Sequence, residues 1–384
     1  MDADTFVMLR ETVRRFVNER LIPNEDRVEN EDAVPPEIIQ DMRDMGLFGL
    51  TVPEEFGGLG LTASEEAQVI FELGRTAFAY RSVIGTTVGI GSQGIVMDGT
   101  DAQKAEWLPK LAAGDMLASF ALTEPNAGSD AASIITSATR DGDVYRVNGT
   151  KRYITNAPRA GVFTLMARTE PELKGAAGIS AFILPADTPG ISFGKLDKKM
   201  GQKGTMTCDV IFDDVIVPAA NIIGGEPGRG FKTAMKVIDR GRIHMSALSS
   251  GMSDRLVEES VRYAVERKQF GAAIGTFQLI QGMIADSRTD AYASWLMVKD
   301  VAARFDAGEK VSADVASTKY FTTEAVGRVA DRAVQIHGGA GYMAEYKVER
   351  FYRDVRLLRI YEGTSQIQQT IIAKALLREA GLKV

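Results

Sequence analysis

One candidate for acid–base chemistry is Glu362, which lies in the segment Tyr361-Glu-Gly-Thr-Ser-Gln366. A carboxylate beside a flexible glycine can act as a general base when burial raises its pKa. Most glutamates in loops are solvated, so this segment taken alone favours an ordinary surface loop. The threonine and serine that follow the glycine are expected to cap the next helix.

Two further polar segments have the composition of a cofactor-binding surface. In Thr123-Glu-Pro-Asn-Ala-Gly-Ser-Asp130, the backbone amides and the hydroxyls of Thr123 and Ser129 suit a phosphate or a polar cofactor. Gln335-Ile-His-Gly-Gly-Ala-Gly-Tyr342 ends a helix, where glycine permits a left-handed cap or the close approach of a ligand. Spacing alone favours a structural role for both segments, as a loop after a strand and as a helix end.

The segment Gly224-Gly-Glu-Pro-Gly-Arg-Gly230 resembles a phosphate-binding P-loop. Gly225 and Gly230 have the required separation, but Phe231 intrudes and places Lys232 one residue out of register. No apolar strand leads directly into the segment. A flexible loop entering a helix is therefore favoured, and a P-loop nucleotide-binding protein is kept as the alternative from a different functional class.

Composition argues against several other kinds of site and partner. The chain has one cysteine, Cys208, and two histidines, His244 and His337, so we expect neither an internal disulfide nor a metal centre. The motifs G-x-S-x-G, H-E-x-x-H and C-x-x-C do not occur, which leaves hydrolase and zinc interpretations without support. A formal net charge of −6 argues against nucleic acid as a partner.

Hydrophobic periodicity predicts an α+β chain in which helices come first, short strands follow and helices return. The changes of pattern place three domains at residues 1–116, 117–228 and 229–384. No apolar run approaches the ~20 residues of a membrane helix, and the N-terminus does not resemble a signal or transit peptide. We therefore expect a cytoplasmic protein without a membrane partner.

Three local patterns within these domains give sharper expectations. Thr62 and Glu65 have the spacing of a capping box at the start of a helix. Asn148-Gly149 is the strongest signal for a two-residue hairpin turn. From Gly230, one long helix is compatible with the periodicity despite two internal glycines.

Taken together, these segments resemble the acyl-CoA dehydrogenase family over essentially the whole chain. The resemblance implies a helical N-terminal domain, a central β-barrel or sandwich domain and a C-terminal four-helix bundle. It also implies FAD, bound between domains and across a subunit contact in a homotetramer. The markers, in the family's order and approximate spacing, are Leu122-Thr-Glu-Pro-Asn-Ala-Gly-Ser-Asp130, Tyr153-Ile-Thr-Asn156, Glu266-Arg-Lys-Gln-Phe-Gly271, Gln335-Ile-His-Gly-Gly339 and Ile360-Tyr-Glu-Gly-Thr-Ser-Gln366.

The activity implied by the resemblance is oxidation of an acyl-CoA thioester to the trans-2-enoyl-CoA. Glu362 matches the family's base and would take the α-proton, while the β-hydrogen leaves as hydride to flavin N5. Some relatives carry the base on a helix at the position that matches Gly241, where glycine cannot serve, so Glu362 is the expected catalytic residue. Electrons are expected to pass to electron-transferring flavoprotein. An acyl-CoA oxidase is the alternative within the family, and the lack of a long C-terminal extension favours the dehydrogenase.

By position, the resemblance also assigns binding roles. Along the flavin and its pyrophosphate we expect Phe120, Leu122, Thr123, Gly128, Ser129, Tyr153 and Thr155. Against the FAD of a neighbouring subunit we expect Arg267, Phe270, Gln278, Gln335, Gly338 and Gly339. Near the base, Thr364 and Gln366 are expected to contact the cofactor. Substrate-binding roles fall to Ser129, Asp239, Arg242, Tyr361 and Gly363.

The segment Tyr80-Arg81-Ser82 is similar to one in the glutaryl-CoA dehydrogenase branch, where the arginine holds the distal carboxylate of the substrate. A buried carboxylate requires a paired cation, so Arg81 is a candidate for binding a dicarboxylyl-CoA. A surface or salt-bridged arginine is the equally weighted alternative, and it would leave a neutral short- or medium-chain acyl-CoA as the substrate. Gly74 departs from the acidic residue of that branch, which favours dehydrogenation without loss of carbon dioxide.

Overall fold

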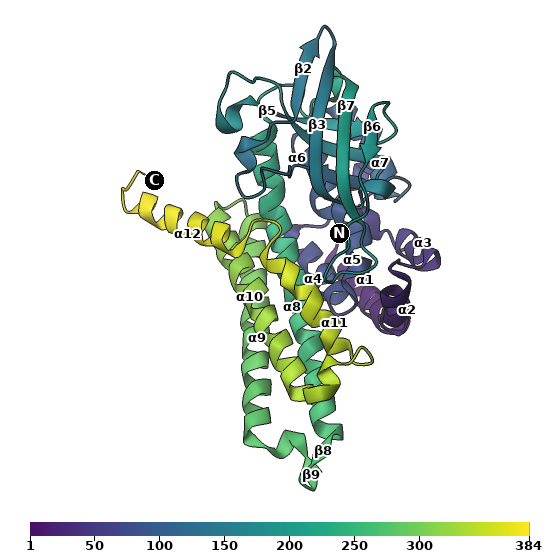
Figure 1. Ribbon diagram of the computed structural model, residues 1–384, viewed down its shortest axis with the longest axis vertical. Coiled ribbons are helices and arrows are strands. Elements are labelled where there is room, and N and C mark those ends of the chain that lie inside the picture. Colours follow the sequence, from purple (N-terminus) through teal and green to yellow (C-terminus); the bar gives the residue numbers. More distant parts are fainter. Residues whose placement is uncertain (384) are drawn as a thin grey trace.

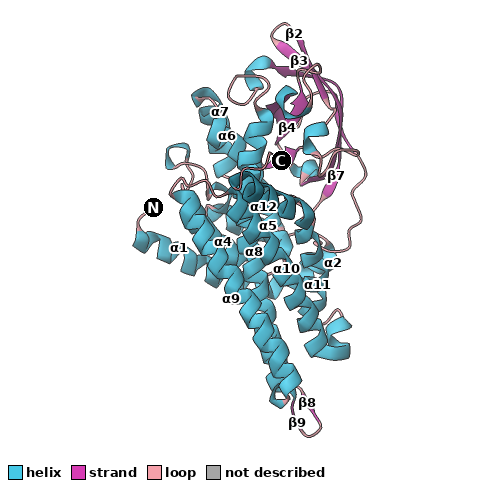
Figure 2. Cartoon of the chain, turned by 90° about the vertical axis from the view of Figure 1, so that its left-hand side faces the viewer, coloured by secondary structure: helices cyan, strands magenta, loops and turns pink. Residues whose placement is uncertain are grey.

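The computed structural model describes residues 1–383, and Val384 lies outside the described residues. A sheet stands at one end of the molecule, N-terminal helices lie below it, and long C-terminal helices extend to the opposite end (Figure 1, Figure 2). This arrangement confirms the predicted order of helices, strands and helices. Among residues 1–383, no helix is long and apolar enough to cross a membrane.

Seven helices form the N-terminal part: α1 (Ala3–Phe16), α2 (Glu25–Glu31), α3 (Pro36–Asp44), α4 (Ala63–Gly74), α5 (Phe78–Gly85), α6 (Gln93–Asp98) and α7 (Asp101–Ala112). The capping box predicted for the start of α4 is confirmed, because the side chains of Thr62 and Glu65 each bond the other's backbone N–H. Two π-helical segments, Val17–Leu21 and Thr86–Gly91, have no counterpart in the sequence pattern.

The middle part is a seven-stranded sheet with the order β1-β4-β2-β3-β7-β6, in which β5 pairs with β4. Its strands are β1 (Ala118–Ala121), β2 (Ser137–Asp141), β3 (Val144–Thr155), β4 (Val162–Arg168), β5 (Ile179–Pro185), β6 (Ile191–Phe193) and β7 (Thr207–Pro218). β1 runs parallel to β4, and its Ser119 hydroxyl donates to the carbonyl of Thr155 at 2.7 Å. The end of β1 and the end of β3, which carry predicted flavin contacts, therefore lie side by side.

The hairpin predicted at Asn148-Gly149 is wrong, because β3 continues through both residues. The turn between β2 and β3 lies at residues 142–143 instead. Gly149 has φ 150 and falls at a register shift between β3 and β7, where a Cβ would lie 2.6 Å from Thr136 Oγ1. Glycine is thus required by a close approach in an irregular strand rather than by a turn.

The C-terminal part consists of α8 (Gly230–Glu266), α9 (Gln278–Asp306), α10 (Ser312–His337), α11 (Lys347–Val355) and α12 (Ser365–Glu379), with the short strands β8 (Lys268–Gln269) and β9 (Ala272–Ala273) at the far tip (Figure 1). α8 is continuous through Gly241 and Gly251, as the pattern allows. At Gly251 a Cβ would lie 2.0 Å from the carbonyl oxygen of Phe71 in α4. The N-terminal helices and the bundle therefore pack backbone against backbone at this crossing.

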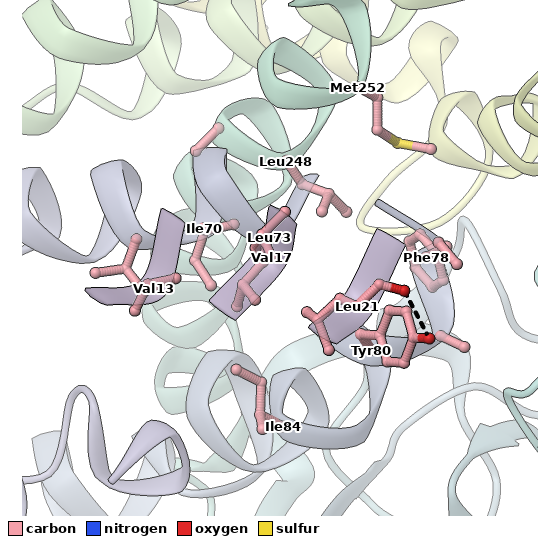
Figure 3. Packing of buried hydrophobic residues seen from close by; sticks show 14 of the residues in the cluster. Val13, Val17, Leu21, Ile70, Leu73, Phe78, Tyr80, Ile84, Leu248 and Met252 are labelled. Carbon is pink, nitrogen blue, oxygen red and sulfur yellow. Dashed lines mark hydrogen bonds between the residues drawn. The ribbon is translucent and has the colours of Figure 1, made fainter. Parts of the chain in front are cut away.

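One apolar core joins α1, α4, α5 and α8 (Figure 3). Its labelled members are Val13, Val17, Leu21, Ile70, Leu73, Phe78, Tyr80, Ile84, Leu248 and Met252. The Tyr80 hydroxyl donates to the carbonyl of Leu21 at 3.0 Å, which satisfies the only polar group of this ring. The contact holds α5, which also carries Arg81, against the first π-helical segment.

Candidate active site

Glu362 lies in the turn between α11 and α12, and its backbone is left-handed with φ 54. Such a backbone is uncommon for a residue with a side chain, and backbone strain of this kind is concentrated at functional sites. Gly363 follows with φ +85, and a Cβ there would meet Gln368 Nε2 at 2.7 Å, so glycine is required. Thr364 then caps α12 by accepting a hydrogen bond from the Ile367 N–H, as the segment predicts.

Three side chains hold the carbonyl groups of this turn. Arg242 Nε donates to the carbonyl of Glu362 at 3.2 Å, and Lys319 Nζ donates to that of Gly363 at 2.8 Å. Gln368 Nε2 donates to both carbonyl oxygens, at 3.1 and 3.0 Å. These bonds offset the strain of the left-handed turn and fix the direction in which the Glu362 side chain leaves it.

The surroundings of Glu362 make it a stronger base than an ordinary carboxylate. Burial raises the pKa of Glu362, and the positive charges of Arg81, Arg242 and Lys319 oppose the rise. Burial also lowers the pKa of Lys319 to about 8. A carboxylate whose pKa lies above its ordinary value accepts a proton from carbon more readily, provided that it is ionised at the working pH.

Gly241 leaves the space in which the Glu362 carboxylate lies. A Cβ built on Gly241 would be 3.2 Å from Glu362 Oε2 and 3.3 Å from Ile90 Cγ2. Position 241 of α8, where some relatives carry the base, therefore faces the Glu362 carboxylate. In this chain that carboxylate comes from the turn before α12 and not from α8. The next residue of α8, the predicted Arg242, donates a hydrogen bond to Asp239 at 2.7 Å.

Arg81 is buried in the same region, with 9% of its surface exposed. Its Nε donates to His244 Nε2 at 2.6 Å, which is the only hydrogen bond it forms within residues 1–383. Burial lowers the pKa of Arg81, opposed by the nearby Tyr361 and Glu362. Arg81 is therefore neither a surface arginine nor one that is paired with a carboxylate.

Tyr361 brings a second polar group to Arg81. Its hydroxyl is buried beside the Gln202 side chain but forms no hydrogen bond of normal geometry among residues 1–383, and its ring packs on Phe78 with 6.4 Å between the ring centroids. Burial raises the pKa of Tyr361, and the positive charge of Arg81 opposes this rise. A buried hydroxyl without a partner costs about 1–3 kcal/mol, so an acceptor bound between these two groups would gain from both.

A buried ion pair holds the loop that follows β1. Lys151 Nζ donates to Glu124 Oε1 at 2.8 Å and to the carbonyl of Leu122 at 2.9 Å, and both charged side chains are inaccessible to solvent or nearly so. The backbone N–H of Arg152 donates to the carbonyl of Thr123 at 2.7 Å. The predicted cofactor residues Leu122 and Thr123 are thereby fixed against β3.

The predicted cofactor residues form two separate groups within one chain. Phe120, Leu122, Thr123 and Thr155 lie at the ends of β1 and β3, with the exposed Gly128 and Ser129 in the following loop. The second group lies at the far tip of the bundle, where Ala264, Ile274 and Ile336 pack together and bring the ends of α8 and α10 beside the β8–β9 turn (Figure 1). Its members Arg267, Phe270, Gln278, Gln335, Gly338 and Gly339 are all exposed.

Both groups present surface that fits a flavin dinucleotide. Tyr153 has φ 57 and is 59% exposed, and the Arg152 guanidinium lies 4.9 Å from the centroid of its ring, so a partly open flat ring stands beside the β1–β3 site. Phe270 is 95% exposed, and a Cβ at Gly338 or Gly339 would meet nothing within 4 Å. Thr364 is half-buried and Gln366 is exposed at the start of α12, close to Glu362 in sequence.

Four residues that shape the site, Lys319, Lys151, Glu66 and His244, belong to none of the motifs that predict it. For His244 the spacing does offer a signal, because it follows Gly241 by three residues and therefore lies on the same face of α8. Glu66, which accepts a hydrogen bond from His244, comes from another helix and leaves no local pattern.

The glycine-rich segment before α8 has a structural explanation. A Cβ at Gly230 would lie 2.2 Å from the backbone of Ser180 and Ala181 in β5, and the N–H of Gly228 donates to the Ser180 hydroxyl at 2.8 Å. The 3₁₀ segment Ala219–Asn221 precedes it, rather than a strand that leads into a helix crossover. These glycines allow α8 to start against the sheet and do not form a P-loop context.

Comparison with family models matches three parts of the chain: "Acyl-CoA dehydrogenase, N-terminal domain" at residues 3–115, "middle domain" at 119–215 and "C-terminal domain" at 228–377. The acryloyl-CoA reductase (NADH) of Anaerotignum propionicum is 41% identical over 97% of this chain and 94% of its own. A (2S)-methylsuccinyl-CoA dehydrogenase of Cereibacter sphaeroides is 38% identical over 96% of this chain and 69% of its own. A subunit of the caffeyl-CoA reductase–Etf complex of Acetobacterium woodii is 38% identical over 97% and 98% of the two chains.

Solved structures agree. Butyryl-CoA dehydrogenase from Megasphaera elsdenii superposes with a TM-score of 0.94 at 35% identity, over 98% of this chain and 100% of its own. Glutaryl-CoA dehydrogenase from Mycobacterium smegmatis is a more distant neighbour, with a TM-score of 0.92 at 29% identity over 100% and 96% of the two chains. PigA with FAD and proline gives a TM-score of 0.93 at 29% identity over 98% and 99%. The chain belongs to the acyl-CoA dehydrogenase family, the FAD-dependent oxidoreductases that act on the CH–CH bond of acyl-CoA thioesters.

Proposed function

We propose that this enzyme interconverts a carboxylate-terminated acyl-CoA and its trans-2-enoyl-CoA, with Glu362 as the base for the α-proton and Arg81 as the group that binds the distal carboxylate. Dehydrogenases and enoyl-CoA reductases both occur among the relatives. The proposal therefore names the carbon–carbon bond that reacts and the acyl group that is bound, and it does not name the direction of the reaction. The observation that carries it is the buried Arg81, which has no carboxylate partner within residues 1–383 and lies near Glu362.

The assignment of the base is supported by the convergence of three features on one carboxylate. Glu362 has a left-handed backbone held by Arg242, Lys319 and Gln368, and burial raises its pKa. Its Oε2 lies where a side chain at position 241 would otherwise stand. FAD, when bound, supplies the acceptor or donor for the hydride at the β-carbon. The protein's own part is to orient the thioester, exclude water and hold the α-proton on Glu362.

The assignment of a distal carboxylate rests on the cost of burying a cation. A buried charge is unfavourable unless a counter-charge or several hydrogen bonds compensate it. Arg81 donates one hydrogen bond, to a neutral histidine, and the nearby Tyr361 hydroxyl forms no hydrogen bond of normal geometry among residues 1–383. A carboxylate accepts bonds from both groups. The relative from Cereibacter sphaeroides acts, by its name, on methylsuccinyl-CoA, an acyl group that carries such a carboxylate.

The remaining partners follow the same reasoning. The Acetobacterium woodii relative is part of a complex with Etf, and we propose an electron-transferring flavoprotein as the redox partner here as well. The exposed residues at the tip of the bundle, including Arg267 and Gln335, lie far from the β1–β3 group in the same chain (Figure 1). This separation supports a homotetramer in which they meet the cofactor of a neighbouring subunit.

The test compares glutaryl-CoA with valeryl-CoA, a neutral acyl group of equal carbon number, in the wild type, Arg81→Gln and Arg81→Lys. Stranding a buried charged partner typically costs ~2–5 kcal/mol, so Arg81→Gln should lower kcat/KM for glutaryl-CoA by roughly 30- to 5,000-fold. The rate with valeryl-CoA should change little. Arg81→Lys keeps the positive charge without the paired N–H groups, so its kcat/KM for glutaryl-CoA should lie between the values of the wild type and Arg81→Gln. Flavin bleaching with an artificial electron acceptor gives both rates.

A ratio of the two kcat/KM values that Arg81→Gln leaves unchanged would refute the distal-carboxylate assignment and leave a neutral acyl-CoA as the substrate. An equal fall for both substrates would instead show that Arg81 supports the pocket around Glu362. In either case the role of Glu362 as the base is tested separately, by the Glu362→Gln variant.

A further inference from the structure

Arg81 is held by a chain of buried groups from three helices. His244 in α8 accepts the hydrogen bond from Arg81 Nε at 2.6 Å, and its Nδ1 lies 2.7 Å from Glu66 Oε1 in α4. The other oxygen of Glu66 binds Arg240 at 2.9 Å, and Arg240 also donates to the carbonyl of Leu61. Glu66 and His244 are both almost fully buried.

The chemistry of the partners determines which nitrogen of His244 carries the proton. A guanidinium has no acceptor atom, so the imidazole Nε2 that faces Arg81 must be unprotonated. The single proton of a neutral imidazole is then on Nδ1 and is donated to the Glu66 carboxylate. A protonated His244 would place two donors, Nε2–H and the Arg81 Nε–H, against each other. Burial and the charge of Arg81 lower the pKa of His244 to about 4, although Glu66 opposes this shift.

This bond leaves one edge of the guanidinium available. With Nε engaged, the two terminal nitrogens of Arg81 have no hydrogen bond within residues 1–383. They lie beside two glycines of the helical segment that carries Arg81, where a Cβ would be 2.7 Å from Cζ at Gly85 and 3.7 Å from Nη2 at Gly89. A guanidinium held in this way offers its two terminal N–H groups to a carboxylate in a bidentate geometry.

The imidazole also keeps Arg81 apart from other anions. It stands between the guanidinium and Glu66, so the two opposite charges are linked without forming a direct ion pair. Without an acceptor at His244, Arg81 would be free to turn toward Glu66 or toward Glu362, both of which act electrostatically on it. Either contact would occupy the edge that a substrate carboxylate needs.

We infer that His244, oriented by Glu66, is a positioning residue that directs Arg81 toward the distal end of the acyl group and thereby sets the preference for a carboxylate-terminated substrate. The inference deepens the proposed function and rests on it. It concerns selectivity, because neither His244 nor Glu66 is placed in contact with the reacting carbons.

The test uses the ratio of kcat/KM for glutaryl-CoA to that for valeryl-CoA in the full-length holoenzyme. His244→Leu removes the acceptor for Arg81 and should lower the ratio about 10- to 100-fold, the usual range for losing a hydrogen bond to a charged group. His244→Gln places an amide oxygen near the position of Nε2 and should recover most of the ratio. Glu66→Gln keeps the shape of the partner and should lower the ratio by a smaller factor.

A second measurement does not depend on the substrate. The chain has only two histidines, so ¹⁵N-histidine labelling gives two ring systems, and a His337→Gln variant assigns them. At pH 7 the His244 ring should be neutral, with the proton on Nδ1, and the Nε2 resonance should shift in Arg81→Leu. A protonated ring or a proton on Nε2 would overturn the inference.

The kinetic outcomes separate the two proposals. If Arg81→Gln leaves the ratio unchanged, the proposed function has failed. If Arg81→Gln lowers the ratio but His244→Leu and Glu66→Gln do not, the proposed function stands and the positioning role is refuted. If His244→Leu lowers both rates equally and His244→Gln restores neither, His244 supports the fold and the positioning role is again refuted.

Discussion

Gly241→Ala should separate stability from activity. In the interior of a helix, alanine is more stable than glycine by about 0.5–1 kcal/mol, since glycine loses more backbone entropy on folding. The new methyl group, however, would lie 3.2 Å from Glu362 Oε2 and 3.3 Å from Ile90 Cγ2, so these neighbours must move by a few tenths of an ångström. A displacement of 1 Å in an active site can cost about 10²-fold in rate, so we expect kcat to fall about 3- to 10-fold.

Two measurements and a matched control check this prediction. Differential scanning calorimetry should show a melting temperature that is unchanged or higher by about 1–3 °C, and flavin bleaching by substrate gives kcat. Gly251→Ala, the same substitution in the same helix, would place its methyl group 2.0 Å from the carbonyl oxygen of Phe71 and should lower the melting temperature. Wild-type kcat in Gly241→Ala, or a loss of stability like that of Gly251→Ala, would refute the geometry derived for Glu362.

Two further predictions concern buried charges. Glu362→Gln should reduce turnover by at least about 10²–10⁴-fold while FAD remains bound, because the amide cannot accept the α-proton. In the wild type, kcat/KM should rise with pH through the raised pKa of Glu362, because only the ionised carboxylate accepts this proton. Between the ordinary carboxyl pKa of 4.5 and this raised value, the folded state keeps a proton that the unfolded state has lost, so the stability of the wild type falls as pH rises. Glu362→Gln should therefore melt at a higher temperature than the wild type at neutral pH but not below pH 4. The opposite order of melting temperatures would contradict the direction of the pKa shift. Lys151→Met leaves Glu124 buried without its partner, so it should lower the free energy of unfolding by about 3–5 kcal/mol and release FAD on gel filtration. The double variant Lys151→Met with Glu124→Gln should recover part of this stability. Equal stability of the single and double variants would show that the ion pair does not hold the flavin loop.

Local sequence was sufficient where a feature depends on neighbours within a few residues. The capping box of Thr62 and Glu65 and the cap at Thr364 involve residues three positions apart, so their side-chain chemistry alone predicts the helix start. The long helix α8 follows from its periodicity, which two glycines weaken without breaking. Asn148-Gly149 shows the limit, because pairing of β3 with β7 overrode the local preference for a turn and used the glycine for a close approach instead.

The order of the elements was thus determined by the sequence, and motifs that are contiguous in the chain also predicted Glu362 as the base that we propose. Only the tertiary structure decided what surrounds the base. Arg81 and His244 are separated by 163 residues and His244 and Glu66 by 178, so no spacing rule connects them. They meet because α4, α5 and α8 pack around one apolar core, and the absence of side chains at Gly85, Gly89 and Gly241 leaves room for the charged groups between these helices. Burial then makes an unpaired arginine costly, and this is the physical reason for expecting a carboxylate on the substrate.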